Sequence, residues 1–169
     1  MPALALTTGE HIFESDAIAL YVAESGPAAT QLVGADALQR AQIRQWICFA
    51  EGELMAHVLP LVLWRVGMAE FDGVREETAW GQLERSLRVL EDWMTGRLWL
   101  ATEAQLSLAD LTVGGSLFWA FMHVIDEEIR KTCPSLTEWY LRLVESPGVK
   151  DVFADYVMIQ TRKRRDAAI

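Results

Sequence analysis

The sequence predicts a mainly α-helical fold in which a small β-hairpin and one helix precede a larger all-helical bundle. Three observations support this fold class. Of the 169 residues, 51% are hydrophobic, which excludes a disordered chain because disordered chains lack that apolar content. After residue 36, apolar residues recur three and four apart, the spacing of one helix face. Short apolar runs around a polar turn, the pattern of a hairpin, occur at the start of the chain.

The hairpin is predicted over residues 2–13. Its two apolar runs flank the polar residues 7–10, where Gly9 suits a tight turn. A two-stranded hairpin is marginal by itself, and its free strand edge can pair with another strand. We therefore expect that edge to be covered by a homodimer partner or another chain, by a swapped segment or by a helix.

A helix is predicted next, because apolar residues lie at helical spacing over residues 17–22. Ser15 or Asp16 can cap this helix by accepting a hydrogen bond from a free first-turn N–H. Gly26 ends it, since glycine accepts the left-handed conformation that follows a last helical turn. Residues 28–36 are predicted to form a linker.

The rest of the chain is predicted to be helical. Pro60 is expected to kink the first long helix, because proline removes a backbone N–H and clashes with the carbonyl of Ala56. A second helix follows the turn around Asp72. The third opens near Ser107, is apolar all round and should lie at the centre of the bundle. Two shorter helices complete it. The apolar stripes are Ile43, Trp46, Ile47, Ala50, Leu54 and Val58; Trp80, Leu83, Leu87, Leu90 and Met94; Leu136, Trp139, Tyr140, Leu143 and Val144; and Val149, Val152, Phe153 and Tyr156.

Charge and hydropathy exclude several classes of partner. The formal net charge of −9 would repel phosphate backbones, so we expect no nucleic acid as the main partner. The longest apolar stretch, residues 111–125, is shorter than the roughly 20 residues that span a bilayer, so no membrane segment is expected. The N-terminus shows no signal-peptide pattern. These features predict a cytoplasmic protein.

Cysteine and histidine usage gives no sign of a metal site. Cys48 and Cys133 are too few and too far apart for a disulfide framework or a zinc site, and the three histidines show no ligand spacing. Cys48, on an apolar helix face, is interpreted as a packing residue. The basic residues 161–165 are predicted to form a solvated tail, with a localisation signal as the alternative.

The segment from Ser107 to Asp110 has the pattern of a capping box in front of an apolar run. In such a box the serine hydroxyl accepts a hydrogen bond from the N–H of the third helical residue, whose carboxylate accepts one from the serine N–H. The aspartate also lies favourably at the positive end of the helix dipole. Its predicted role is structural, because it starts a helix that enters the core without unpaired N–H groups.

Three short signatures together resemble the glutathione transferase family. Residues 98–100 (LWL) and 106–111 (LSLADL) resemble the "fLvGe…lTLADi" signature of its helical domain. Residues 12–18 (IFESDAI) look like its "l-x-ESxAI" motif, and residues 2–4 (PAL) resemble its "VPaL" turn, which has a cis-proline. The order and separation of the signatures agree with the family, and the resemblance covers essentially the whole chain.

The branch that the chain resembles most is the transferase-like domain of the elongation-factor gamma subunit, together with stand-alone fungal relatives. Residues 45–50 (QWICFA) support that branch. The resemblance implies a glutathione-transferase C-terminal-like helical bundle preceded by a truncated thioredoxin-like hairpin plus helix. The implied domains are residues 1–27, a remnant of the glutathione-binding domain; residues 28–36, a linker; and residues 37–169, the all-helical domain.

The resemblance also implies a glutathione site. In the family the Glu-Ser pair, here Glu14 and Ser15, binds the γ-glutamyl end of glutathione; the alternative is that the pair only caps a helix. Met1 falls where the family's backbone pairs with the cysteinyl part, beside Pro2. The family's thiol-activating Tyr, Ser or Cys lies before this turn and has no counterpart here. The helices that line the family's substrate pocket carry four residues that could instead be ordinary core or surface residues: His57, Trp64, Trp119 and His123.

Two functions follow as expectations from this resemblance. The first is a glutathione-binding transferase-like protein, with glutathione as cofactor, that acts on an apolar electrophilic small molecule. It would conjugate that molecule, or isomerise it through reversible glutathione addition, in fungal secondary metabolism. The second is a non-catalytic protein-interaction module like the gamma-subunit domain. The missing thiol activator argues against catalysis, while the matching Glu14-Ser15 motif argues for glutathione binding.

Overall fold

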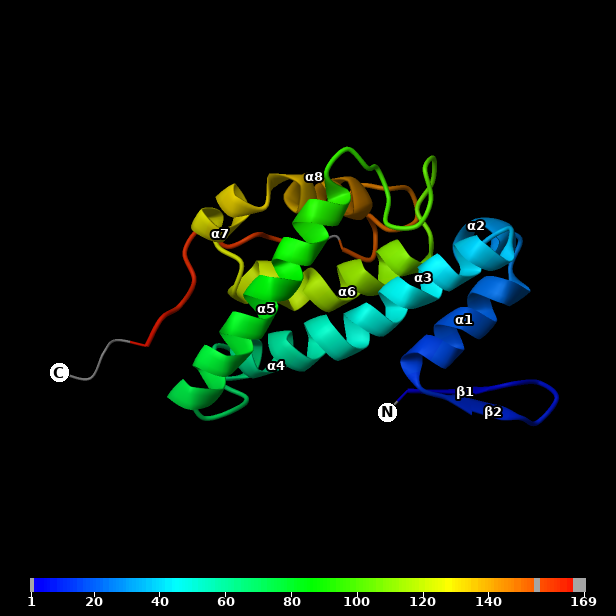
Figure 1. The fold of residues 1–169 in the computed structure, drawn as a ribbon. Helices are drawn as coiled ribbons and strands as arrows, with labels where there is room; N and C mark the ends of the chain where they lie inside the picture. The colour runs from blue at the N-terminus through cyan, green and yellow to red at the C-terminus, as the bar shows by residue number, and fades with distance from the viewer. Residues whose placement is uncertain (1, 154–155, 166–169) are drawn as a thin grey trace.

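The computed structural model describes residues 2–153 and 156–165 of the chain. Two expectations lie outside the described residues: the backbone contact proposed for Met1 and the cis bond between Met1 and Pro2. The described part is mainly helical, as predicted (Figure 1). Its elements are β1 (Ala3–Ala5), β2 (His11–Phe13), α1 (Ser15–Ser25), α2 (Ala29–Val33), α3 (Ala37–Phe49), the π-helix η1 (Ala50–Met55), α4 (Ala56–Leu63), α5 (Gly73–Met94), α6 (Leu108–His123), α7 (Glu127–Thr132) and α8 (Pro134–Val144).

The hairpin and α1 form a small unit at one end of the bundle (Figure 1). The two strands pair antiparallel, with Ala3 opposite Phe13. Gly9 has a φ of 98° in the connecting turn, a conformation that costs glycine little because it lacks a Cβ. The predicted hairpin is therefore confirmed, and α1 follows it after a single residue.

Helix α6 lies at the centre of the bundle, as its all-round apolar pattern predicted. It contacts α3, η1, α4, α8, α1 and α2. Its residues Val113, Leu117, Ala120 and Phe121 are fully buried, and Gly114 lets Leu143 of α8 approach closely. Burial on this scale drives folding because it removes apolar area from water at roughly 25 cal/mol per Å².

The capping box at the start of α6 is present. Asp110 Oδ2 accepts hydrogen bonds from the Ser107 N–H at 2.8 Å and from the Ser107 hydroxyl at 2.9 Å. Asp110 Oδ1 accepts two more at 2.9 Å, from the Leu100 N–H and from Trp139 Nε1. The fully buried carboxylate thus joins the cap to the preceding loop and to α8, which the sequence pattern did not indicate.

The distortion expected at Pro60 lies earlier in the chain. Helix α4 continues through Pro60, and the irregular turns are those of η1, directly before α4. A π-helix places one extra residue in a turn and is frequent at functional sites. The stretch Ala37–Leu63 is long and apolar enough to cross a membrane, judged by length and composition alone. In its most apolar 18-residue segment, 39% of the residues are buried inside the bundle. Its residues Ile43, Trp46 and Ile47 are buried in the core, so we interpret it as a core helix.

Several local predictions were wrong. The predicted linker contains α2, and α7 was not anticipated. The stripe beginning at Val149 forms turns rather than a helix as far as residue 153, because Val152 is 78% exposed and the stripe has no single buried face. Cys48 is exposed rather than packed. The basic tail is not free in solvent, since Arg65 Nε donates a hydrogen bond to the Lys163 carbonyl at 3.1 Å.

Candidate functional site

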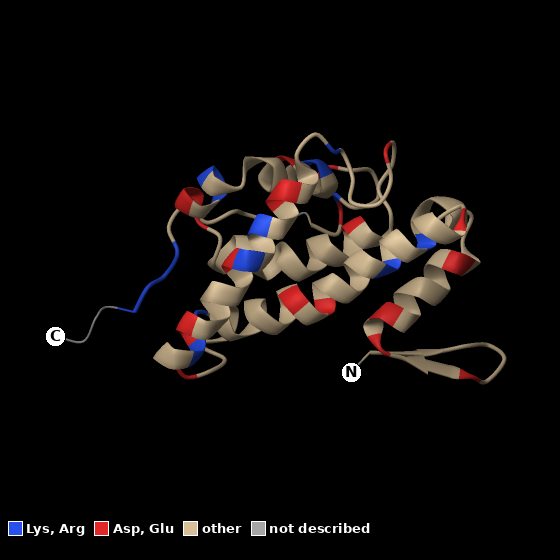
Figure 2. Cartoon of the chain, viewed as in Figure 1, with Lys and Arg blue, Asp and Glu red and all other residues tan. Residues whose placement is uncertain are grey.

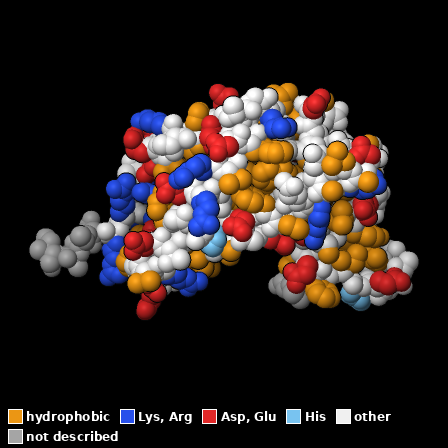
Figure 3. All heavy atoms as spheres, viewed as in Figure 1, with side chains coloured by type: hydrophobic (Ala, Val, Ile, Leu, Met, Phe, Trp, Pro, Cys, Tyr) orange, Lys and Arg blue, Asp and Glu red, His pale blue; other side chains and the backbone are white. Residues whose placement is uncertain are grey.

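A cleft of about 590 Å³, lined by both polar and apolar side chains, lies between α1, η1 and α6. The space-filling view shows a hollow between the unit that carries the hairpin and the body of the bundle (Figure 3). The π-helical turns of η1 bring Glu51 and Met55 to the cleft, opposite the first turn of α1. The lining residues are Ser15, Asp16, Ala19, Glu51, Met55, Leu108, Leu111, Thr112, Gly115 and Ser116.

Glu14 and Ser15 form the corner between β2 and α1. Glu14 has a φ of 71°, the left-handed region that a side chain with a Cβ rarely adopts and that often marks a functional site. Both residues are exposed, and Ser15 lines the cleft. The sequence suggested that Ser15 or Asp16 caps the helix, but α1 begins at Ser15 and its N-cap residue is Glu14, which makes no side-chain cap hydrogen bond. First-turn N–H groups of α1 therefore lack a side-chain acceptor at the N-cap and can receive a ligand carboxylate.

Asp16 of α1 and Glu51 of η1 face each other in the cleft. Desolvation raises the pKa of Asp16, and the charge of Glu51 and a hydrogen bond with it raise that pKa further, while the charge of Arg44 opposes the shift. Asp16 Oδ2 is buried without a hydrogen-bond partner. The pair can share a proton, or it can bind a cationic group such as an ammonium, which would satisfy the buried oxygen. Sequence reasoning missed this pair because 35 positions separate the two carboxylates, and although Asp16 lies within the motif of residues 12–18, Glu51 lies in no motif.

The α6 wall of the cleft carries two hydroxyl groups one turn apart. Thr112 Oγ1 donates to the Leu108 carbonyl at 2.9 Å, and Ser116 Oγ donates to the Thr112 carbonyl at 3.0 Å. Their protons are occupied within the helix, so toward a ligand they can act as acceptors. Gly115 lies beside them, and a Cβ there would meet nothing within 4 Å. This wall is therefore open and weakly polar.

An apolar groove of about 520 Å³ adjoins the cleft on the other side of Ser15. It lies between α1, the loop around Pro27 and the start of α6, and Pro2 also lines it. Ser15, Ala19, Leu108 and Leu111 line both the groove and the cleft. Ser15 thus lies where the cleft, which carries the carboxyl groups of Asp16 and Glu51, meets the apolar groove.

The four aromatic and histidine residues suggested for a substrate pocket do not line the cleft or the groove. Trp119 and His123 stack on each other, with their ring centroids 5.5 Å apart. Burial lowers the pKa of His123, and the charge of Arg65 lowers it further. Trp64 belongs to another cluster, in which its Nε1 donates to Glu76 at 2.7 Å. His57 is half-buried on α4. Of the four residues, Trp119 and His123 are the pair whose rings stack on each other.

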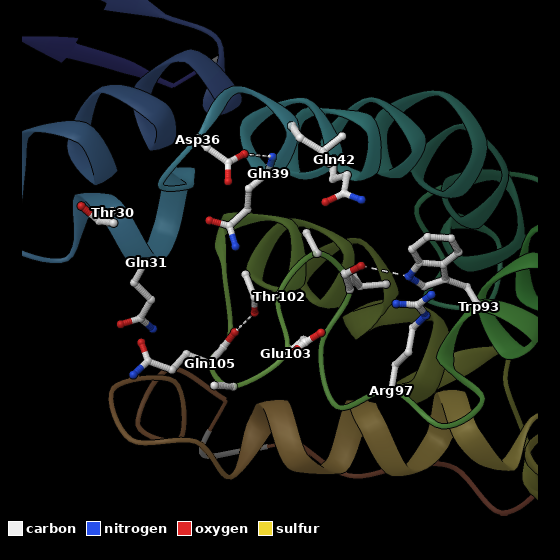
Figure 4. Close-up of a pocket in the computed structure, with 14 residues that line it drawn as sticks. Thr30, Gln31, Asp36, Gln39, Gln42, Trp93, Arg97, Thr102, Glu103 and Gln105 are labelled. Carbon is white, nitrogen blue, oxygen red and sulfur yellow. Dashed lines mark hydrogen bonds between the residues drawn. The ribbon is translucent and has the colours of Figure 1, made fainter.

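Another cavity, of about 530 Å³ and with a largely polar lining, lies between α2, the start of α3 and the loop after α5 (Figure 4). The side chains of Gln31, Gln39 and Gln42 border it. Two hydrogen bonds fix its loop wall: Gln31 Nε2 donates to the Leu106 carbonyl at 3.0 Å, and Trp93 Nε1 donates to the Leu100 carbonyl at 2.9 Å. This cavity shares no lining residue with the cleft beside Ser15, and sequence reasoning did not find it.

The family model "Glutathione S-transferase, C-terminal domain" matches residues 52–147, more than half of the chain. The chain belongs to the glutathione S-transferase family. The chain is 49% identical over 163 residues to the glutathione S-transferase-like protein LUC7 of a Fusarium species, with 96% of this chain and 74% of that protein covered. This confirms the resemblance drawn from the three short signatures.

Two solved structures share the fold of this glutathione S-transferase family member. The glutathione S-transferase-like domain of elongation factor 1-gamma from Saccharomyces cerevisiae superposes with a TM-score of 0.89 at 24% identity, covering 97% of this chain and 78% of that one. The glutathione transferase URE2P6 from Phanerochaete chrysosporium, in complex with oxidized glutathione, gives a TM-score of 0.80 at 19% identity, covering 92% and 72%. The predicted helical bundle with a hairpin and helix before it is therefore confirmed.

Proposed function

We propose that this chain is a glutathione-binding, transferase-type protein that acts on an apolar, electrophilic small molecule. The observation that carries the proposal is the position of Ser15, at the N-terminus of α1 and on the shared wall of the apolar groove and the cleft that carries Asp16 and Glu51. A ligand with a charged end and a reactive thiol needs such a pair of compartments. Membership of the glutathione S-transferase family supports the choice of ligand.

The residues of the cleft fit the γ-glutamyl end of glutathione, which carries a carboxylate and an ammonium on one carbon. The first-turn N–H groups of α1 and the Ser15 hydroxyl can donate to the carboxylate. The Glu14 and Asp16 carboxylates can accept hydrogen bonds from the ammonium. Binding of the ammonium at Asp16 would give the buried Oδ2 atom the hydrogen-bond partner that it lacks. Glutathione supplies a thiol nucleophile, which forms a bond to an electrophilic carbon and, on reversal, allows a double bond to isomerise.

The cleft residues favour binding over thiol ionisation. A free thiol has a pKa of about 8.5 and is mostly protonated at neutral pH. Among the residues that line the cleft, none carries a positive charge, and Asp16 and Glu51 carry carboxyl groups. Nearby carboxylates raise a thiol pKa rather than lowering it. We therefore propose that the groove holds an apolar substrate next to the thiol and that orientation contributes more than activation.

The test is thermal unfolding with and without reduced glutathione. A ligand that binds only the folded state stabilises it by about 2.7 kcal/mol at a hundredfold excess over Kd, which for a chain of this size raises Tm by roughly 5–10 °C. Ser15→Ala should remove the shift. Ser25→Ala, in the last turn of the same helix where the hydroxyl donates to the Tyr21 carbonyl, is the matched control and should retain it. An unchanged Tm at 10 mM glutathione, a concentration chosen to exceed any useful Kd, would sink the proposal and favour a non-catalytic interaction module.

We also propose that a second copy of the chain covers the hairpin edge. The described sheet has two strands, and Phe13 on β2 is 60% exposed. The unpaired N–H and C=O groups along an exposed strand edge are a template for pairing with another chain, and Phe13 adds exposed apolar area. Sedimentation velocity should give a dimer in which the hairpin amides are protected from hydrogen exchange. A monomer with rapidly exchanging hairpin amides contradicts this expectation.

A further inference from the structure

The C-terminal tail, residues 156–165, runs along the bundle without helix or strand. Backbone hydrogen bonds hold its first half, where the Ile159 N–H donates to the Phe121 carbonyl and the Glu127 N–H donates to the Gln160 carbonyl, both at 3.2 Å. Arg130 Nη1 also donates to the Ile159 carbonyl at 2.6 Å. The second half is the basic run that follows Thr161, which passes α7 and the N-terminal part of α5 (Figure 2).

Three cations of the tail lie over three aromatic rings. Arg162 Cζ is 4.3 Å from the centroid of Trp80, Lys163 Nζ is 5.5 Å from that of Trp64, and Arg165 Cζ is 4.9 Å from that of Phe71. A cation within about 6 Å of a ring centroid is attracted by the negative face of the ring. We call this surface the aromatic groove; it consists of Trp64, Phe71, Glu76, Glu77, Trp80 and Asp126.

The walls of the aromatic groove are set by contacts that do not involve the tail. Arg65 and Glu76 form an ion pair at 2.6 Å in which the Arg65 side chain is 4% exposed. The Trp64 ring packs edge-on against Phe71, with centroids 5.0 Å apart, and its Nε1 donates to Glu76. These contacts lie within the bundle and do not need the tail, and the one bond from Arg65 to the tail goes to the Lys163 carbonyl, a backbone group that any extended segment offers.

Acidic groups add charge complementarity. Asp126 Oδ2 accepts from the Arg162 N–H at 3.3 Å and lies 3.7 Å from Arg162 Nε. Glu76 and Glu77 line a cavity of about 300 Å³ with Arg164 and Arg165. A second cavity, of about 420 Å³, lies on the α7 side of Arg162 and Arg164. The tail therefore leaves space in the groove on both sides of its basic run.

We propose that the aromatic groove is a docking site for an arginine- and lysine-rich segment of another protein, and that the chain's own tail occupies it in the absence of that partner. The tail shows the chemistry that the groove accepts: an extended segment whose cations cover aromatic faces and whose first arginine pairs with Asp126. Most contacts of the basic run come from side chains, so another chain with the same charges can make them. The groove shares no residue with the cleft beside Ser15, so this proposal is independent of the proposed enzyme function.

The chain's own tail competes with any free basic peptide for the aromatic groove. A short tether gives an effective concentration on the order of millimolar, so a free basic peptide should bind the intact chain weakly and bind strongly only when the tail is neutralised. The experiment uses a fluorescent peptide with the sequence of residues 157–165 and measures anisotropy at low salt. The two proteins compared are the unaltered 169-residue chain and a tail variant with Arg162→Gln, Lys163→Gln and Arg165→Gln. A control peptide carries the same three replacements.

The tail variant should bind the basic peptide at least tenfold more tightly than the unaltered chain, and neither should bind the control peptide. Adding Trp80→Leu to the tail variant should abolish binding, whereas adding Trp119→Leu, a tryptophan outside the groove, should not. Circular dichroism confirms that each variant is folded. The proposal is overturned if the basic peptide binds the two proteins with equal affinity. It is also overturned if the peptide binds neither protein at concentrations up to 1 mM, a range chosen to match the effective concentration of the tethered tail. Sedimentation showing dimers of the unaltered chain that the tail replacements abolish overturns it as well, since the groove would then hold the tail of a second copy.

Discussion

The buried carboxylate of Asp110 gives the sharpest test of how the bundle is held together. Replacing Asp110 by alanine leaves three N–H donors without an acceptor: those of Ser107 and Leu100, and Trp139 Nε1. All three residues are at most 1% exposed, so bulk solvent does not reach these donors in the native packing. Each buried unpaired donor costs about 1–3 kcal/mol, and we expect Asp110→Ala to lower the free energy of unfolding by about 3–5 kcal/mol.

Two further variants separate the parts of this effect. Asp110→Asn keeps one carbonyl oxygen, which can serve Leu100 and Trp139, but it turns an NH₂ group toward the Ser107 N–H. We expect it to cost about 2 kcal/mol. Ser107→Ala removes the hydroxyl alone and should cost about 1 kcal/mol, the usual value of an N-cap side chain. Asp92→Ala, an exposed aspartate on α5, is the control and should change stability by less than about 0.5 kcal/mol.

Urea unfolding followed by tryptophan fluorescence and circular dichroism measures these differences. With an m-value of roughly 2 kcal/mol per molar urea, Asp110→Ala should lower the midpoint by about 2 M. The reasoning would be refuted if Asp110→Ala unfolded within 1 M of the unaltered chain, or if Asp110→Asn were as stable as the unaltered chain. A change in m would instead indicate loss of two-state unfolding.

Three further predictions concern packing, protonation and thiol reactivity. Gly114→Ala should destabilise the fold by about 1–3 kcal/mol because its Cβ would overlap Leu143 Cδ2. Gly81→Ala on α5, where a Cβ would meet nothing within 4 Å, should instead stabilise it by about 1 kcal/mol. A urea midpoint for Gly114→Ala as high as that for Gly81→Ala would contradict the close packing at Gly114. The pKa of His123 is lowered in the folded state, so the unfolded chain binds more protons below the usual histidine pKa near 6.5. The free energy of unfolding should therefore fall as the pH drops below that value. His123→Gln should make the free energy of unfolding depend less on pH in this range. A thiol titration of the native chain should show rapid reaction of the exposed Cys48 and slow reaction of Cys133, whose thiol pKa burial raises to about 11; equal rates would contradict this.

Much of the fold was predictable because helices depend on local contacts. Hydrogen bonds between residues four apart and side chains on one face lie within a single helix, so the stripes of α3, α5 and α8 could be recognised without a partner. The capping box at Ser107 and the hairpin turn at Gly9 are equally local. The stripe at Val149 failed because its residues do not share one buried face, a property that only packing decides.

The candidate site was predictable only in part. The Glu14-Ser15 corner carries a motif, and the structure places Ser15 at the cleft. The carboxylate opposite it, Glu51, comes from η1 and lies beside Asp16 only because α1 and η1 both pack on α6. No periodicity or spacing in the sequence predicts that Asp16 and Glu51 lie side by side.

The sequence by itself determined the order of the longer helices, the buried face of most of them and the corner at Ser15, because each depends on residues a few positions apart. Tertiary structure alone decided which carboxylates face that corner, how Asp110 ties three segments together and where the basic tail lies. Arg65 and Lys163 meet across 98 positions of the chain. Contacts at such separations are set by how the helices fill the core, and the energy of that packing is spread over many residues rather than concentrated in a motif.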